Sequence, residues 1–206
     1  MKSMNDFDNP FQIILAFEQA VAKYTGAPYC VTTDCCSHAI EIAFRLAHDK
    51  SPVSFPAYTY LSVPMTLRKL GISYTLEDRT WKDSYQFNGS NIHDCARLLK
   101  ENMYLSGSVQ CLSFGMNKPL YIGRGGCLLT DNLELYIKAS RMRFDGRDLF
   151  NYSPWVTQQV FSVGYHYYMR PEECLIGLNL LENCQFTEQL DEYYNYPDCR
   201  QIVIND

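Results

Sequence analysis

The stretch QCLSFGMNKPLYIGRGG (110–126) lies between two apolar, β-prone runs, VQCLSF (109–114) and GCLLTD (126–131). Between these runs the chain has a single lysine, Lys118, and then the glycine-rich sequence GRGG (123–126). Because small and apolar residues flank Lys118, its amine is expected to be partly removed from water. The pattern predicts two strands joined by a turn that presents one amine.

Segments of helical and of strand-like periodicity alternate through most of the chain. This alternation predicts an α/β domain with a mostly parallel sheet and helices on both faces. The expected helices are 11–24, 37–49, 60–71, 132–144 and 170–184, and the expected strands are 29–33, 52–57, 72–78, 91–94, 109–114 and 126–131.

Composition excludes several classes of function. The net charge of −5 and the lack of any basic run argue against nucleic acid as a partner. The first residues, MKSMNDFDNPFQ, lack the apolar core of a signal peptide, and no apolar stretch approaches membrane-spanning length. The nine cysteines show no spacing typical of a metal site. Free thiols in a reducing cytoplasm, with no metal, are therefore expected.

Polar and reactive residues gather where the predicted strands end. They are Cys36-Ser37-His38, Tyr58-Thr59-Tyr60, Asp94, and the segment from Ser113 to Lys118. In an open parallel sheet, ligands bind beyond the carboxyl ends of the strands. The common placement of these residues predicts a ligand site at that edge.

Five motifs in order resemble those of the DegT/StrS-type sugar aminotransferases, which depend on pyridoxal phosphate and have the fold type I of aspartate aminotransferase. The family pattern Ser-Phe-x-x-x-Lys followed by a glycine-rich turn is similar to SFGMNK (113–118) and GRGG. The other motifs that carry the resemblance are CCSHAIEIAF (35–44), PAYTY (56–60), IHDCAR (92–97) and GYHYYM (164–169).

The resemblance implies roles for three central residues. Lys118 would form a Schiff base with pyridoxal 5'-phosphate, Asp94 would pair with the protonated ring nitrogen, and Tyr60 would stack on the ring face. From the residues alone, Lys118 could instead be a solvated turn lysine. Asp94 could cap a following helix, and Tyr60 could pack in the core.

The resemblance also implies the surroundings of the cofactor. Ser37 and His38, at a helix N-terminus, would hold the phosphate together with Ser113. Arg97 would lie near the phenolic oxygen, where relatives have glutamine or histidine, and His166 would reach the phosphate of a neighbouring subunit in a homodimer. Ser37 could equally be a plain helix cap, and Arg97 a surface arginine.

Several departures from the family pattern concern size and substrate contacts. The chain is shorter than typical members, so we expect a cofactor-binding domain over 1–183 and, at 184–206, a short vestige of the small C-terminal domain. Arg124 stands where relatives have glutamate, and Cys36 where they have glycine. The cofactor residues match the family better than the substrate residues do.

The function implied is a cytoplasmic aminotransferase that moves an amino group from an amino acid such as glutamate to a nucleotide-linked keto-sugar. Its partners would be these small molecules and a second copy of the chain. A second hypothesis is a non-catalytic or regulatory family remnant that binds the cofactor or a sugar nucleotide. A third keeps the cofactor but catalyses dehydration or decarboxylation.

Overall fold

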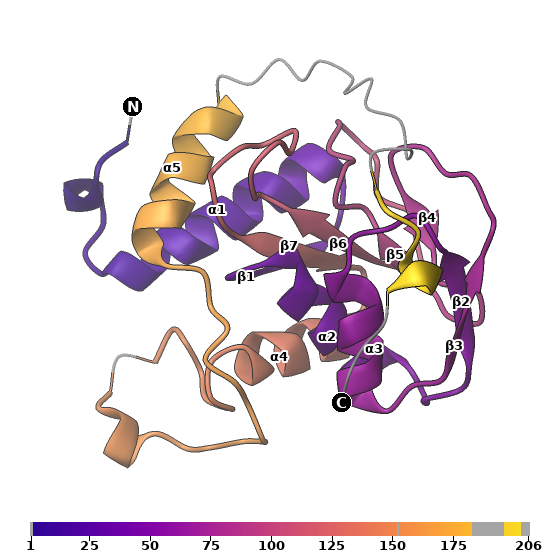
Figure 1. Cartoon of the computed structure of the whole chain (residues 1–206). Helices are drawn as coiled ribbons and strands as arrows, with labels where there is room; N and C mark the ends of the chain where they lie inside the picture. Colours follow the sequence, from indigo (N-terminus) through magenta and orange to yellow (C-terminus); the bar gives the residue numbers. More distant parts are fainter. Residues whose placement is uncertain (1, 152, 183–195, 203–206) are drawn as a thin grey trace.

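A five-stranded sheet forms the centre of the computed structural model, which describes residues 2–151, 153–182 and 196–202 (Figure 1). The strand order is β1-β7-β6-β5-β4. The bounds are Tyr29–Thr33 for β1, Tyr85–Gln86 for β4, Ile92–Asp94 for β5, Val109–Ser113 for β6 and Gly126–Thr130 for β7. Beside it, β2 (Val53–Pro56) and β3 (Tyr74–Glu77) form a separate parallel pair.

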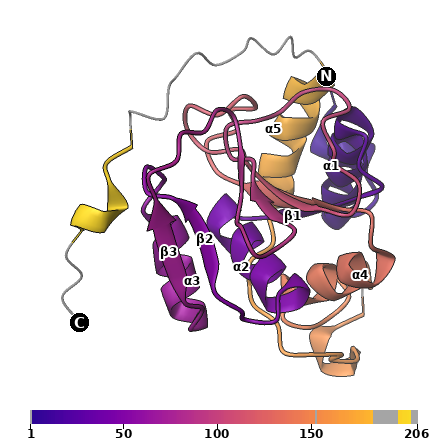
Figure 2. The ribbon, with the colours of Figure 1, turned by 90° about the vertical axis from the view of Figure 1, so that its right-hand side faces the viewer.

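Helices cover both faces of the five-stranded sheet, as predicted (Figures 1 and 2). Helices α1 (Pro10–Thr25) and α5 (Pro171–Glu182) lie on one face, and α2 (Cys36–Ala47) and α4 (Leu133–Met142) lie on the other. Helix α3 (Ser62–Leu70) packs beside α2. Short 3-10 helices are Met4–Asp6, Trp155–Thr157 and Cys199–Gln201.

Two apolar cores follow from the alternation of side chains along each strand. In β7, Leu129 packs with the residues of α1 and α5, whereas its neighbour Leu128 packs with those of α2 and α4. In β6, Leu112 and Cys111 divide in the same way. The strands are therefore buried on both faces, which explains their continuous apolar runs.

The expectation of a mostly parallel sheet is wrong. In the five-stranded sheet only the β5–β6 pairing is parallel, while β1–β7, β6–β7 and β4–β5 are antiparallel. The physical reason lies in the connection over residues 114–125, which contains no helix and turns the chain straight back after β6. A parallel neighbour would need a longer crossover, usually through a helix.

The described part of the C-terminal segment returns to the edge of the domain. The backbone N–H of Cys199 donates to the carbonyl of Ala57 at 3.0 Å, and Asp198 forms a β-bridge with Tyr58. The predicted boundary between 183 and 184 lies outside the described residues, as does most of the expected tail.

The glycines of GRGG bring β7 against the start of α2. Gly123 and Gly125 have positive φ angles of 105° and 117°, which favour glycine. At Gly126 a Cβ atom would lie 2.4 Å from the backbone nitrogen of Cys36. The turn thus fixes how closely the N-terminus of α2 approaches β7.

We expect Gly126→Ala to destabilise the protein by about 1–3 kcal/mol, because the added methyl group must push backbone atoms apart. The free energy of unfolding in urea measures this. Gly115→Ala is the control, since its Cβ would meet only the Ser113 hydroxyl at 3.5 Å. Equal losses in both variants would contradict the close approach.

Candidate functional site

A cavity of about 420 Å³ opens beyond the ends of β1, β2, β5 and β6. It brings together most of the residues predicted from the sequence: Ser37, Tyr60, Asp94, Arg97, Ser113 and Lys118. These residues are far apart in the chain, and the sheet collects them at one edge. The structure brings these residues together, and their function as a site and the role of each stay predictions.

Asp94 supplies a buried carboxylate at the end of β5. Its side chain accepts hydrogen bonds from the Ala96 N–H at 2.8 Å and from the Tyr85 hydroxyl at 3.0 Å. Residues 95–103 form turns, so the alternative that Asp94 caps a helix is wrong. Burial raises the pKa of Asp94, and the two hydrogen bonds and the charge of Lys118 offset only part of that rise.

A short hydrogen-bond chain holds this carboxylate. The Tyr85 hydroxyl lies 2.7 Å from Thr59 Oγ1. Because the tyrosine proton is directed at Asp94, Thr59 must donate to the tyrosine oxygen. Tyr85 could not be predicted from the sequence, because it lies on the two-residue strand β4, which is too short to show alternation.

Lys118 lies half-buried on the turn between β6 and β7. It lines the same cavity as Asp94, and its positive charge lowers the pKa of Asp94 and of the Cys36 thiol against the larger effect of burial. The structure therefore places the amine and the carboxylate in one cavity, within electrostatic range of each other.

Hydroxyl groups and a helix N-terminus provide hydrogen-bond donors in the cavity. Ser37 Oγ donates to Ser62 Oγ at 2.6 Å, and Ser113 also lines the cavity. Helix α2 begins at Cys36 with Cys35 as its N-cap, so Ser37 lies in the first turn and is not the cap. Free N–H groups of a first turn favour an anion.

Aromatic residues and an arginine form the outer part of the cavity. Tyr60 is 63% exposed, so its alternative as a core residue is wrong. Arg97 is half-buried, and its guanidinium donates to the Tyr196 hydroxyl at 3.4 Å and lies 5.8 Å from the centre of that ring. Arg97 is therefore a cavity residue and not a simple surface arginine.

Trp81 and Tyr196 are cavity residues that sequence analysis missed. Their rings stack with centroids 6.0 Å apart, and the Trp81 indole N–H donates to the Tyr58 carbonyl at 2.8 Å. The sequence signal that could have revealed Trp81 is a large aromatic residue in the otherwise polar connection before β4. Tyr196 gave none, because it comes from the C-terminal segment, far from Arg97 in the chain.

Two predicted cofactor residues, His38 and His166, do not line the cavity. The His38 ring stacks on Tyr167, with centroids 3.6 Å apart, and its Nδ1 lies 2.5 Å from Asp34. His166 is exposed, pairs with Asp145 at 3.2 Å and borders a separate cavity of about 390 Å³. Within one chain, neither histidine is placed with the other site residues.

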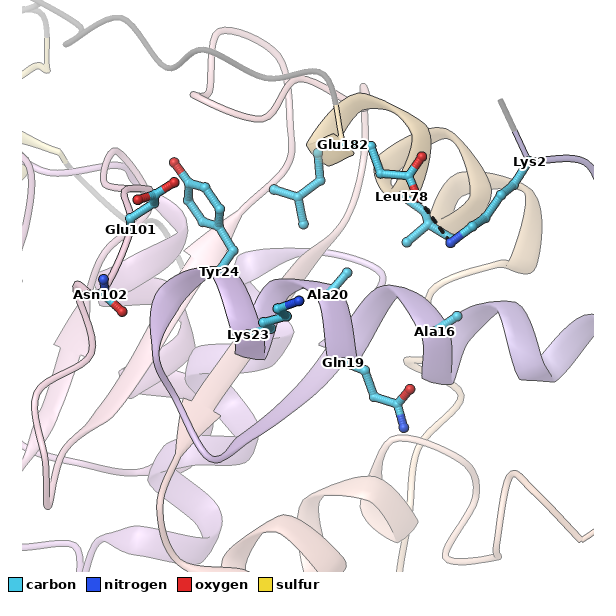
Figure 3. Close-up of a pocket in the computed structure, with 11 residues that line it drawn as sticks. Lys2, Ala16, Gln19, Ala20, Lys23, Tyr24, Glu101, Asn102, Leu178 and Glu182 are labelled. Carbon is cyan, nitrogen blue, oxygen red and sulfur yellow. Dashed lines mark ion pairs between the residues drawn. The ribbon is translucent and has the colours of Figure 1, made fainter.

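Another groove, of about 560 Å³, lies between α1 and α5 (Figure 3). Ala16 and Ala20 from α1 and Leu178 from α5 border it, and Lys2 pairs with Glu182 across one end at 3.0 Å. It contains none of the residues predicted from the sequence. Most of the residues predicted to take part in catalysis or cofactor binding line the cavity that contains Lys118.

Comparison with known families gives a match that covers most of the chain. Residues 4–81 and 80–193 match the DegT/DnrJ/EryC1/StrS aminotransferase family. The chain belongs to this family. Pyridoxal phosphate is the cofactor of the family, in agreement with the resemblance seen in the motifs. A comparison with curated protein sequences found no match.

Solved structures show the same fold at low sequence identity. AtS13 from Actinomadura melliaura is 18% identical with a TM-score of 0.67, and the match covers 83% of this chain and 60% of AtS13. PseC from Helicobacter pylori, an aminotransferase of pseudoaminic acid biosynthesis, is 13% identical with a TM-score of 0.64, and the match covers 83% and 57%.

A third structure shows a relative with its cofactor. NtdA from Bacillus subtilis, with bound PMP, is 15% identical with a TM-score of 0.67, and the match covers 82% of this chain and 48% of NtdA. The chain thus spans between 48% and 60% of the length of these three proteins. A bilayer-spanning helix is absent from the described part of the chain.

Proposed function

We propose that the chain is an aminotransferase that uses pyridoxal 5'-phosphate, with Lys118 as the residue that links the cofactor covalently. The observation that carries the proposal is the placement of the Lys118 amine and the buried Asp94 carboxylate in one cavity. Family membership supports the reaction type. The proposed domain that performs it spans 1–183.

The residues present fit this cofactor. Asp94 is 7% exposed and would pair with a cationic ring nitrogen, which would balance a charge that is otherwise costly to bury. Ser37, Ser113 and the first turn of α2 would hold the phosphate. Tyr60 would cover a face of the ring, and Arg97 would contact a ring oxygen.

When bound, the cofactor supplies an electron sink for carbanion chemistry. The chain supplies the remaining parts. Lys118 carries a proton between two carbon positions, for which its amine must be partly desolvated and must lie within reach of both. Asp94 keeps the ring nitrogen protonated. The Tyr85–Thr59 hydrogen bonds orient that carboxylate.

We extend the proposal to substrate and assembly. A nucleotide-linked keto-sugar as acceptor, with glutamate as donor, is supported by relatives such as DesI, whose structure was determined with its TDP-sugar product. The exposure of His166 outside the cavity of its own chain supports a homodimer in which it reaches the phosphate of the partner. The unpaired state of the eight described cysteines supports a cytoplasmic location.

The absorption spectrum of the purified protein with added pyridoxal phosphate, recorded before and after glutamate, tests this function. Conversion of the cofactor from its aldehyde to its amine form is the expected result. Binding without conversion would favour the second hypothesis, a non-catalytic remnant. No binding would contradict both.

Tyr85→Phe tests the hydrogen bond that orients Asp94. The phenylalanine removes a donor that lowers the pKa of Asp94, so that pKa rises and the carboxylate becomes protonated at higher pH. We expect pyridoxal phosphate to bind roughly tenfold more weakly, since a hydrogen bond to a charged group contributes about 1.5 kcal/mol. Titration with the cofactor should show a larger defect at pH 6 than at pH 8.

Tyr74→Phe is the control for this change, because Tyr74 lies on β3 and does not line the cavity. Its affinity for the cofactor should equal that of the wild type at both pH values. A Tyr85→Phe variant with the same affinity and pH dependence as the wild type would contradict the orienting role.

A further inference from the structure

Cys35 differs from the other cysteines in its surroundings. Of the eight cysteines in the described ranges, the other seven are buried and Cys35 is partly exposed. It is the N-cap of α2 and also lines the cavity that contains Lys118. Its side chain accepts no capping hydrogen bond, and the residue lies at the positive end of the helix dipole.

His38 and Asp34 form a cluster with this thiol. Side-chain donor atoms of Asp34, Cys35 and His38 all lie within 4.8 Å of one another. Asp34 also accepts a hydrogen bond from the Arg124 guanidinium at 2.8 Å. The stack on Tyr167 fixes the plane of the imidazole. Arg124 thus holds Asp34 in place and Tyr167 holds His38 in place, so the cluster does not depend on a single flexible side chain.

The groups around the Cys35 thiol are charged. Burial lowers the pKa of His38, but its hydrogen bonds to Asp34 and Cys35 and their charges outweigh that effect and raise the pKa to about 9. Burial raises the pKa of Asp34, but His38 and Arg124 more than reverse this, so the carboxyl stays ionised. Lys69, whose amine donates to the Tyr167 hydroxyl at 3.1 Å, is itself paired with Glu41 at 2.8 Å. At neutral pH, His38 therefore supplies a positive charge next to Cys35, while Asp34 and Arg124 form an ion pair in the same cluster.

We propose that Cys35 is a reactive thiol, activated by His38 and Asp34, that takes low-molecular-weight disulfides and soft electrophiles at the edge of the cavity. In the exchange step the Cys35 thiolate attacks one sulfur of a disulfide. A new S–S bond forms, the original S–S bond breaks, and the other half leaves as a thiolate, so no external oxidant is required. Because Cys35 and Ser37 line the same cavity, the adduct occupies space there.

Iodoacetamide labelling in limiting amounts, with EDTA present and with peptide mass spectrometry of all nine cysteines, tests the reactivity. Cofactor-free protein at pH 7 should be labelled at Cys35 at least about tenfold faster than at any buried cysteine, since reactive thiols need both exposure and a nearby cation. Labelling of Cys35 no faster than that of the buried cysteines would overturn the proposal.

Two further measurements test the activation. His38→Gln should slow labelling of Cys35 roughly tenfold, because the cation beside the thiol is lost, whereas His48→Gln should not slow it. Equal labelling rates of Cys35 in His38→Gln and in the wild type would contradict activation by His38.

Glutathione disulfide tests the exchange and its consequence for the cavity. One glutathione should attach at Cys35, and none to Cys35→Ser under the same conditions. The modified wild type should bind inorganic phosphate or pyridoxal phosphate more weakly than the unmodified protein. The labelling rates do not depend on the proposed function. A protein that fails to bind the cofactor but is labelled fast at Cys35 would contradict the proposed aminotransferase function and would still support the reactive thiol.

Discussion

Lys118→Ala is expected to abolish the borohydride-sensitive yellow colour that the wild type acquires with pyridoxal phosphate. Alanine removes the only amine that the structure places in the cavity among the residues it describes. Transamination should fall by about 10²–10⁴-fold, the usual contribution of a positioned proton-transfer group. Absorption spectra and single-turnover conversion with glutamate measure the two effects.

Lys100→Ala is the matched control for this change. Lys100 is exposed, lies in the connection between β5 and β6, and does not line the cavity. Its variant should keep both the colour and the rate. A Lys118→Ala protein that keeps the borohydride-sensitive colour would show that another lysine holds the cofactor.

Asp94→Asn is expected to shift the thermal stability of the cofactor-free and cofactor-bound protein in opposite directions. Burial raises the folded-state pKa of Asp94, so ionisation opposes folding. The folded state is therefore most stable when Asp94 is protonated. Its free energy of unfolding is unaffected by this group below the unfolded-state pKa and falls as the pH rises toward the folded-state pKa. Without cofactor, the amide should therefore raise Tm at pH 8 and leave it unchanged at pH 4.

With pyridoxal phosphate present, the same variant should lose stability relative to the wild type. The neutral amide cannot pair with a cationic ring nitrogen, and the loss of one partner of a buried pair costs about 2–5 kcal/mol. Cofactor affinity should fall at least roughly thirtyfold, with a smaller ligand-induced increase in Tm. Calorimetry and cofactor titration measure both effects.

Asp8→Asn is the control, because Asp8 is exposed near the N-terminus and lies outside the cavity. It should leave the Tm of both forms at the wild-type value. An Asp94→Asn protein that binds the cofactor as tightly as the wild type would show that the carboxylate does not contact the ring nitrogen.

Helix positions and the buried strands were predictable because they follow local periodicity. The helix over 11–24 corresponds to α1, and the apolar runs around 109–114 and 126–131 correspond to β6 and β7. Strand direction was not predictable in this way. Periodicity indicates which face of the sheet a side chain lies on. The relative direction of two strands depends instead on whether the connection at 114–125 forms a crossover or a tight turn.

The inner residues of the site were predictable because they lie at strand ends or within a turn between strands, as with Asp94 at the end of β5 and Lys118 on the turn after β6. The outer residues were not. Tyr196 reaches Arg97 across a separation of 99 positions, and Tyr85 reaches Asp94 from a strand of two residues. Such contacts arise from tertiary packing and leave no pattern in the local sequence.

The placement of His38 shows a further limit. Its position in the first turn of α2 was correct, but the pattern could not reveal that the ring turns toward Asp34 and Tyr167. The direction of the ring depends on Asp34, which follows β1, and on Tyr167 in the segment before α5, which only the fold brings together. The same geometry links His38 to Cys35.

Peptide mapping after borohydride reduction of the protein with pyridoxal phosphate tests the central proposal most directly. We expect a single cofactor-derived mass addition, located on the peptide that contains Lys118. The addition should disappear in Lys118→Ala and weaken in Asp94→Asn. A modification spread over surface lysines, or none at residue 118, would contradict it.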